Sequence, residues 1–322
     1  MNAAANAVGA AAQKRVLLTG AQGFTGQHLV PLLRAAGWDV WSLDRSPPEG
    51  AGLIPAAQCL QADLLDDAAL QRAVHQVEPQ AVVHLAAIAF VGHGSADDFY
   101  HVNVVGTRHL LQALSTLPVK PQCVLLASSA NIYGNSHEGA LPESTTANPA
   151  NDYAVSKLAM EYMARLWLPQ LPVVLVRPFN YTGLGQSPQF LIPKIVEHAL
   201  RKAEVIELGN LDVDRDFSDV RDVAAAYVRL LDSAAQGLAV GRVFNVGSGR
   251  TWSLRNVLAQ VQQISGHGME VRVNPAFVRA NEVRILRADT TALEQTIGEW
   301  RRYQLVDTLR WMLDAQRTTW VV

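Results

Sequence analysis

A short apolar run, Val16-Leu-Leu-Thr, leads into glycines at Gly20, Gly23 and Gly26, and a helical pattern over Gln27–Ala36 follows. In such a turn the first glycine permits the sharp bend, the second lets backbone N–H groups approach a pyrophosphate, and the third allows close packing of helix on strand. The N-terminus of the helix favours an anion. The segment therefore predicts the phosphate-binding turn of a dinucleotide-binding βαβ unit. The other candidate cofactor-binding residues of this turn are Gln22, Phe24 and Thr25.

An acidic residue follows at the position where such units bind a ribose. Asp44 ends the next apolar run, Val40–Leu43, 18 residues after Gly26. A carboxylate there accepts hydrogen bonds from the hydroxyls of an adenosine ribose and favours NAD. Arg45 beside it can instead bind a ribose phosphate. We therefore expect either NAD(H) or NADP(H) as the cofactor.

Apolar runs alternate with helical patterns along most of the chain. Stretches of 15 or more residues separate successive runs, which are Val16–Thr19, Val40–Leu43, Ala81–Leu85, Cys123–Ala127 and Val173–Val176. A sixth run, Val243–Val246, follows a helical pattern from Asp219 to Leu231. Continuous apolar strands between helices are typical of a sheet buried on both faces. The fold class predicted is α/β, a doubly wound parallel (Rossmann) sheet with a smaller α/β substrate-binding lobe.

The same alternation divides the chain. We expect residues 13–178 and 217–248 to form the dinucleotide-binding domain, and residues 179–216 and 249–322 to form the substrate-binding lobe over the carboxyl ends of the strands. Residues 1–12 are rich in alanine and lack the bulky apolar core of a signal peptide, so they are predicted to be a disordered leader.

Composition excludes several other classes of protein. Hydrophobic residues make up 49% of the chain and the net charge is −2, with no basic stripe for nucleic acid. No run of 18 apolar residues indicates a membrane span. Cys59 and Cys123 are the two cysteines, which we interpret as small buried residues in a reducing compartment. A cytoplasmic protein without a bound metal is predicted.

A tyrosine and a lysine form the candidate catalytic pair. In Asn151-Asp-Tyr-Ala-Val-Ser-Lys157, Tyr153 and Lys157 are four residues apart at the start of a helical pattern and share one face. A lysine ammonium held against a phenol lowers its pKa from about 10 toward neutrality, where it can exchange protons with a sugar hydroxyl. Taken alone, the spacing also fits an unrelated pair on a helix surface.

From Lys14 onward the chain resembles the extended short-chain dehydrogenase/reductase family. The matching motifs are TGAQGFTG (19–26), Asp63-Leu64, HLAA (84–87), NVVGT (103–107), SSANIYG (128–134), YAVSK (153–157) and RPFN (177–180). The resemblance implies contacts of Asp63 and Leu64 with adenine, and contacts of Ala86 and Ala87 with the pyrophosphate. It also implies that Asn103 steadies the catalytic helix. Leu85 and Pro178 complete the expected cofactor-binding set, together with Tyr153 and Lys157.

The resemblance also assigns Ser129, four residues before Tyr133, as the active-site hydroxyl. Its O–H would donate to a carbonyl oxygen that becomes an alkoxide during hydride addition. Ser129 could alternatively satisfy backbone groups at a strand end. His84 is expected to be structural, and a helix-capping role is the alternative for Asp63.

The residues after this hydroxyl narrow the chemistry. Family members that eliminate water from a nucleotide sugar carry acids there, whereas this chain has Ala130 and Asn131. An amide cannot exchange the proton that elimination requires, so a dehydratase is disfavoured. Hydride transfer at C4 remains.

Two segments, 177–186 and 208–222, resemble the GDP-sugar branch of the family. The resemblance implies that Asn180 binds the sugar-side phosphate, that Arg215 and Arg279 bind the diphosphate, and that Glu282 binds ribose hydroxyls. Asn131 joins Ser129 as a further substrate-binding candidate. Arg215 lies among acidic residues, so a surface ion-pair network is an alternative. Tyr181, Leu184 and Asn131 depart from residues usual in this branch, which has His, Pro and an acid there.

The function expected is NAD(P)H-dependent reduction of the C4 ketone of a GDP-4-keto-6-deoxy-D-mannose type sugar. The product would be GDP-D-rhamnose or GDP-6-deoxy-D-talose, a precursor of surface polysaccharide such as lipopolysaccharide. A nucleotide-sugar 4-epimerase is the alternative, and a cofactor-sensing binding protein is a third reading. Family habit implies a homodimer. A membrane or a nucleic acid is not an expected partner.

Overall fold

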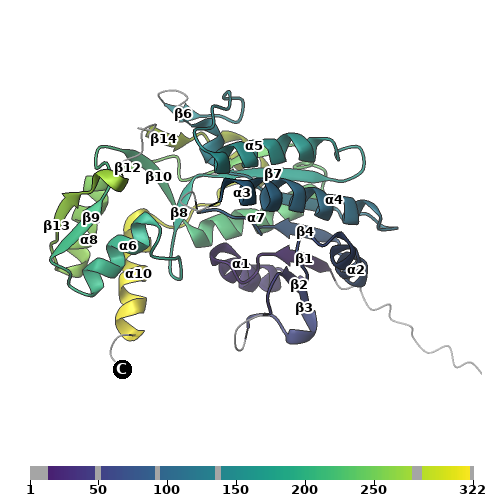
Figure 1. The fold of residues 1–322 in the computed structure, drawn as a ribbon, viewed down its shortest axis with the longest axis horizontal. Coiled ribbons are helices and arrows are strands. Elements are labelled where there is room, and N and C mark those ends of the chain that lie inside the picture. Colours follow the sequence, from purple (N-terminus) through teal and green to yellow (C-terminus); the bar gives the residue numbers. More distant parts are fainter. Residues whose placement is uncertain (1–13, 48–51, 91–94, 135–138, 278–284, 320–322) are drawn as a thin grey trace, which may run out of the picture.

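The computed structural model describes residues 14–47, 52–90, 95–134, 139–277 and 285–319. Its central layer is a seven-stranded parallel sheet in the order β11-β7-β5-β4-β1-β2-β3 (Figure 1). The strands are β1 (Arg15–Thr19), β2 (Asp39–Asp44), β3 (Cys59–Gln61), β4 (Ala81–His84), β5 (Cys123–Ala127), β7 (Val173–Pro178) and β11 (Val243–Val246). The predicted parallel α/β fold is confirmed, and the six predicted strands lie within two residues of their expected ends. The sequence pattern missed β3.

Helices cover both faces of this sheet, and adjacent strand residues face opposite sides. Leu18 in β1 packs in the core beneath α1 (Phe24–Ala35) and α7 (Val220–Ala235). Leu17 packs in the opposite core, beneath α2 (Asp67–Val77), α4 (Thr107–Ser115) and α5 (Asp152–Arg165). Burial on both faces explains why the strands are continuous apolar runs. Shorter helical segments are η1 (Ala56–Gln58), α3 (Ala96–Tyr100), the π-helix η2 (His101–Gly106), the 3-10 helix η3 (Ala130–Tyr133) and α9 (Thr291–Ile297).

Helix α1 begins at Phe24, three residues before the predicted start, because the glycine turn leads directly into it. Helix α7 begins at Val220, where the Asp219 carboxylate accepts a 2.8 Å hydrogen bond from the Arg221 N–H and caps the first turn. Helix α7 extends to Ala235, beyond the predicted pattern.

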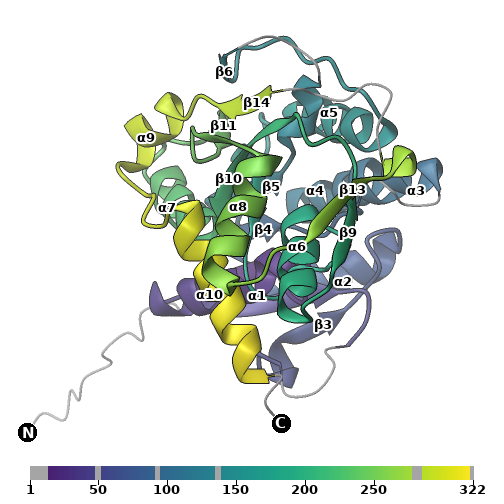
Figure 2. The ribbon, with the colours of Figure 1, turned by 90° about the vertical axis from the view of Figure 1, so that its left-hand side faces the viewer.

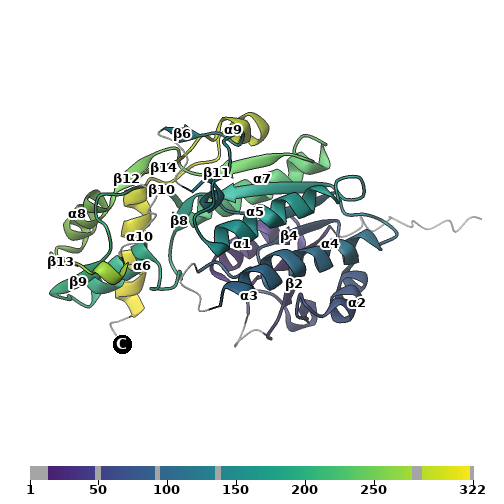
Figure 3. The same cartoon turned by 45° about the horizontal axis from the view of Figure 1, so that its top comes forward.

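A second lobe lies at the carboxyl ends of the strands (Figures 1 and 3). Its larger sheet has the order β12-β10-β14-β6, and β8 also pairs with β10, while β13 and β9 form a two-stranded sheet. Figure 2 shows α6, α8 and α10 in front of the central sheet. The elements are β6 (Ala140–Leu141), β8 (Asn180–Thr182), α6 (Leu191–Leu200), β9 (Val205–Leu208), β10 (Asp214–Asp219), β12 (Thr251–Ser253), α8 (Leu254–Ser265), β13 (Glu270–Val273), η4 (Pro275–Phe277), β14 (Ile285–Ala288) and α10 (Leu305–Thr319).

Strand β10 crosses the predicted boundary between residues 216 and 217, so the division into domains stays a prediction. The predicted leader, residues 1–12, lies outside the described residues. Within the described ranges, no helix combines the length and the apolar character needed to cross a bilayer. The same ranges hold no group of three or more residues arranged as metal ligands.

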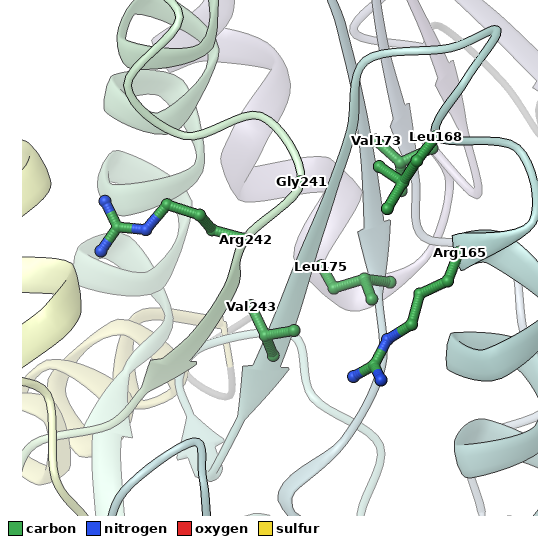
Figure 4. Close-up of a pocket in the computed structure, with 7 residues that line it drawn as sticks. All are labelled: Arg165, Leu168, Val173, Leu175, Gly241, Arg242 and Val243. Atoms are coloured by element: carbon green, nitrogen blue, oxygen red, sulfur yellow. The ribbon is translucent and has the colours of Figure 1, made fainter.

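A cavity of about 270 Å³ opens at the amino ends of β7 and β11 (Figure 4). Val173 and Val243, the first residues of these strands, line it together with Leu175 and the side chain of Arg165. This cavity is at the opposite end of the sheet from the second lobe. It is therefore separate from the carboxyl ends of the strands, where the candidate active site lies.

Candidate active site

The glycine turn has the geometry of a phosphate cradle. Gly20 has a φ of +74°, and a Cβ there would lie 2.8 Å from the Ala86 backbone nitrogen. A Cβ on Gly26 would lie 2.5 Å from the carbonyl oxygens of Gly20 and Ala21. At Gly23, apart from its two chain neighbours, the Gly20 carbonyl oxygen is the sole atom of the described residues that would lie within 4 Å of a Cβ, at 3.2 Å. Two of the glycines are thus required by packing, whereas Gly23 leaves the outer side of the turn open to a ligand.

Asp44 ends β2 beside this turn. Burial raises the pKa of the Asp44 carboxyl above its usual value. Hydrogen bonds from Gln22 and from the backbone of Ala21 and Gly20 oppose this shift but do not cancel it. Its Oδ2 atom is buried without a hydrogen-bond partner in the described part of the chain. A ribose hydroxyl is a donor that such an oxygen lacks. The turn and Asp44 together fit the pyrophosphate and adenosine ribose of a dinucleotide. Arg45 next to it is exposed.

Other predicted cofactor-binding residues lie in the segments that follow β3 and β4. The Thr19 hydroxyl accepts a 3.2 Å hydrogen bond from the Ala86 N–H, which holds the run Leu85, Ala86 and Ala87 against the end of β1. Asp63 instead accepts a 2.9 Å bond from the Leu65 N–H, in a local turn, and Leu64 is buried against Gly106. The adenine contacts of Asp63 and Leu64 stay predictions.

His84 forms a buried chain of hydrogen bonds at the end of β4. The Thr107 hydroxyl donates to the Asn103 carbonyl at 2.7 Å, so it accepts from His84 Nε2 at 2.9 Å. Nδ1 then accepts from the Thr19 hydroxyl at 2.7 Å. Burial, and secondarily the charge of Lys157, lowers the pKa of His84 to about 3. A neutral imidazole therefore joins β1 to the start of α4, in keeping with the expected structural role.

Helix α5 brings the candidate catalytic residues together. Asn151 caps it, accepting a 2.9 Å bond from the Ala154 N–H, and this fixes the register of Tyr153 and Lys157 on its buried face. Tyr153 is 7% exposed and Lys157 is 5% exposed. Ser129 caps η3 after β5 and hydrogen-bonds the Tyr153 side chain. Serine, tyrosine and lysine thus converge at the carboxyl end of β5, and their catalytic roles stay predictions.

The expected lowering of the Tyr153 pKa by Lys157 is wrong for this structure. Burial raises the pKa of Tyr153 to about 12, against an opposing effect of the Ser129 hydrogen bond. Burial also lowers the pKa of Lys157 to about 8, against the opposing charge of Glu161. The Lys157 ammonium donates at 2.8 Å to the carbonyl of Ala127. At neutral pH Tyr153 is therefore a phenol, which can donate a proton.

Asn103 links the cofactor side to the catalytic helix. Its side-chain amide accepts from the Ile88 N–H at 3.0 Å, donates to the Ile88 carbonyl at 3.2 Å, and donates to Ser156 Oγ at 3.1 Å. Ser156 lies between Tyr153 and Lys157 in the chain. Asn103 is therefore placed where it can steady α5.

The described substrate-binding candidates are spread over three elements. Asn131 lies in η3, where its N–H donates to Ser129 Oγ at 3.2 Å. Asn180 begins β8 and is half-buried, two residues after Pro178 at the end of β7. Arg215 lies in β10 and donates to the Asp214 carbonyl at 3.0 Å. Arg279 and Glu282 lie outside the described residues.

Two acidic neighbours of Arg215, Asp212 and Asp216, have partners elsewhere. Asp212 pairs with Arg255 at 3.1 Å, and both are exposed. Asp216 is buried and accepts hydrogen bonds from the N–H and hydroxyl of Ser248 and from the N–H groups of Gly249 and Ala288. Asp216 therefore fastens the loop after β11 and does not belong to a surface network.

Tyr181 was not among the predicted site residues, but it contacts the first turn of α1. Its hydroxyl is 2.8 Å from the Thr25 hydroxyl, and its ring stacks on Phe24 with a centroid distance of 5.9 Å. The second lobe thus contacts the first turn of α1 directly. Its departure from the usual histidine was the sequence signal that pointed to this position.

Comparisons with known proteins agree with this geometry. Residues 16–247 match the NAD dependent epimerase/dehydratase family. The chain is 34% identical to the GDP-6-deoxy-D-talose 4-dehydrogenase of Aggregatibacter actinomycetemcomitans, over 91% of this chain and 94% of that protein. It is also 34% identical to the GDP-6-deoxy-D-mannose reductase of Pseudomonas aeruginosa, over 89% of this chain and 92% of that protein.

Solved structures confirm the fold class. A crystal structure of a candidate epimerase from Burkholderia cenocepacia J2315 is 51% identical, with a TM-score of 0.87 over 95% of this chain and 98% of that one. The structure of RMD from Pseudomonas aeruginosa complexed with NADPH is 32% identical, with a TM-score of 0.81 over 95% and 99%. The predicted cofactor class is confirmed at the level of the family. The chain belongs to the NAD dependent epimerase/dehydratase family, the extended short-chain dehydrogenases/reductases.

Proposed function

We propose that this protein reduces the C4 ketone of a GDP-4-keto-6-deoxy-D-mannose type sugar with NAD(P)H, giving GDP-D-rhamnose or GDP-6-deoxy-D-talose. The observation that carries the proposal is the buried Tyr153, a phenol hydrogen-bonded to Ser129 one helical turn before Lys157. Two relatives named for GDP-6-deoxy sugars, each 34% identical, support the substrate class.

In the proposed mechanism, NAD(P)H bound at the glycine turn and Asp44 would supply the hydride that C4 accepts. Ser129 donates a hydrogen bond to the ketone oxygen and orients the carbonyl. Tyr153 transfers its phenolic proton to that oxygen as negative charge develops, so C4 becomes a secondary alcohol. Lys157 would hold the nicotinamide ribose and stabilise the tyrosinate that remains.

Substrate and cofactor positions follow from the same arrangement. Asn131 and Asn180 flank the carboxyl ends of β5 and β7, where they would contact sugar and phosphate, and Arg215 would bind the diphosphate. Arg279 and Glu282 are retained as proposed nucleotide contacts. Asn131 cannot serve as a general acid, which keeps elimination of water outside the proposal.

Purified protein would be mixed with GDP-4-keto-6-deoxymannose, made in place by a separate dehydratase, and the absorbance of NADH or NADPH followed. Oxidation that depends on the sugar supports the reductase, and NMR of the product identifies the configuration at C4. No oxidation of either cofactor would refute it. The family description and the Burkholderia structure favour an epimerase as the second candidate. An epimerase would retain NAD through gel filtration and interconvert sugars without net redox change.

We expect the enzyme to prefer NADH to NADPH, because Asp44 holds a buried oxygen without a partner where a ribose phosphate would bring negative charge. Replacing Asp44 with Ser should remove the repulsion and let Arg45 contact the phosphate. The ratio of kcat/KM for NADH over NADPH should fall by roughly a hundredfold. An unchanged ratio would show that Asp44 does not determine the preference between NADH and NADPH.

A homodimer through α5 is part of the proposal. On this helix, Ala154 and Met160 are buried in the core of the subunit. Tyr162 and Leu166 instead point outward and are 62% and 76% exposed. Large apolar groups on one helix surface are typical of an interface.

Replacing Tyr162 and Leu166 together with Glu is expected to give a monomer, because buried unpaired carboxylates would oppose association. Light scattering after gel filtration measures the mass. Val119→Glu is the control, since Val119 is 79% exposed on the loop after α4 and should leave the mass unchanged. A wild-type mass in the double variant would place the contact elsewhere.

A cytoplasmic location is proposed as well, since NAD(P)H and the free thiols of Cys59 and Cys123 suit a reducing compartment. There the enzyme would supply precursors of a surface polysaccharide such as lipopolysaccharide.

A further inference from the structure

A buried arginine connects the two segments that carry the candidate catalytic residues. Arg177, near the end of β7, is 5% exposed. Its Nε donates to one oxygen of Glu161 at 2.8 Å and its Nη2 donates to the other at 2.6 Å. Its Nη1 donates at 2.8 Å to the Tyr133 hydroxyl and at 2.9 Å to the Glu143 carbonyl. The guanidinium therefore has partners on four separate acceptor atoms.

The Tyr133 contact reaches the Ser129 turn. Tyr133 is the last residue of η3, and Ser129 is the residue that caps its start. The Tyr133 hydroxyl also donates to Asn245 Oδ1 at 2.7 Å, and the guanidinium lies over its ring at 5.1 Å. The end of this short turn is thus held from two sides, by β7 and by β11.

The Glu161 contact reaches the Lys157 helix. Glu161 follows Lys157 by one turn of α5, so the two share a face. Lys157 in turn donates to the Ala127 carbonyl, and Ala127 pairs in register with Val176, the residue before Arg177. These contacts form a closed cycle that links α5, β5 and β7.

The Arg177–Glu161 pair is better explained by the geometry it imposes than by the stability it adds. A buried ion pair contributes little net stability, because desolvation offsets its attraction, and an apolar pair can replace it. A planar guanidinium fork nevertheless fixes the relative positions of its acceptors. We propose that Arg177 is a positioning residue, which sets the separation of Ser129 from Lys157 and so the aim of Tyr153 at the ketone. This inference rests on the proposed function.

The charge of Glu161 affects the pKa of Lys157, and this effect can be measured. The titratable groups nearest to Lys157 are Tyr153 and Glu161 on α5 and the neutral His84 from β4. Arg177 from β7 pairs with Glu161 and also contacts Tyr133 from η3. Among them, the Glu161 carboxylate favours the charged form of Lys157. Removing its charge therefore makes Lys157 lose its proton at lower pH.

The first test compares Tyr133→Phe and Arg177→Lys with Arg221→Lys. Arg221 is a matched control, because it makes its own two-pronged contact with Asp219, at 2.9 and 2.7 Å, away from the Ser129 turn. We expect kcat per folded molecule to fall roughly tenfold in Tyr133→Phe and roughly a hundredfold in Arg177→Lys. Arg221→Lys should stay near wild type. Tyr133→Phe keeps the buried Arg177–Glu161 pair. If Arg177→Lys fails to fold, the kcat of Tyr133→Phe therefore tests the proposal alone.

The second test requires no sugar. NADH affinity of wild type and of Glu161→Gln would be measured by fluorescence across the alkaline range. The pH at which affinity declines should move down by roughly one unit in the variant. Sugar-independent binding keeps this result separate from the assay of the proposed function. The proposal would be overturned if kcat fell equally in Arg177→Lys and Arg221→Lys and if the pH dependence of NADH affinity were the same in Glu161→Gln as in wild type.

Discussion

Replacing Tyr153 with Phe is expected to lower kcat by roughly a thousandfold or more while NADH affinity stays within about twofold. The substitution removes a single oxygen, the proposed proton donor and the partner of Ser129. The ring itself is buried and makes an edge contact with Phe99 at 5.9 Å, which phenylalanine retains. Steady-state kinetics with the keto sugar, and NADH titration by fluorescence, separate the two quantities.

The control for this variant is Tyr227→Phe. Tyr227 is a buried tyrosine of α7 that lies near Tyr153 and Tyr181. Its replacement should leave kcat within about threefold, because no step of the proposed mechanism uses its hydroxyl. Substantial turnover by Tyr153→Phe would show that another group protonates the sugar oxygen.

Replacing Lys157 with Met is expected to abolish turnover and to stabilise the protein. Burial lowers the pKa of Lys157 from 10.5 to about 8, so folding at neutral pH places an ammonium where it is disfavoured. That difference corresponds to roughly 3 kcal/mol. A methionine of similar length fills the same space without a charge. The variant should therefore have a higher Tm at pH 7 and weaker NADH binding.

The pH dependence of this gain has a defined sign. Below the folded pKa of about 8, lysine is protonated in both states and the full penalty acts on wild type. As pH rises from there toward 10.5, the folded protein binds fewer protons than the unfolded chain, and wild type gains stability. The advantage of Lys157→Met in denaturant unfolding should shrink over this interval. A variant less stable than wild type at pH 7 would contradict the account.

Much of the fold was predictable because the sheet is buried on both sides. A strand such as Val173–Pro178 must be apolar at nearly every position, which separates it clearly from the helices around it. Strand β3 lacks that signal, since Cys59-Leu-Gln61 is three residues long and partly exposed at the sheet edge. The second lobe has short strands and carried no comparable pattern.

The candidate site was predictable in its parts and not in its electrostatics. Ser129, Tyr153 and Lys157 follow from motifs, and the structure places them together. The pKa of Tyr153 depends on how deeply α5 is buried, which is a tertiary property that helical spacing does not contain. Likewise, nothing in the spacing of Glu161 and Arg177 indicated that their side chains would pair beneath the Ser129 turn.

The most direct test of the account follows the hydride itself. NADH carrying deuterium at its transferable position would be incubated with the enzyme and GDP-4-keto-6-deoxymannose, and the sugar examined by NMR. The account predicts stoichiometric oxidation of the cofactor, deuterium on C4 and nowhere else, and loss of both in Tyr153→Phe. A sugar product without deuterium, formed while no external cofactor is consumed, would contradict it and identify an enzyme that returns hydride to its substrate.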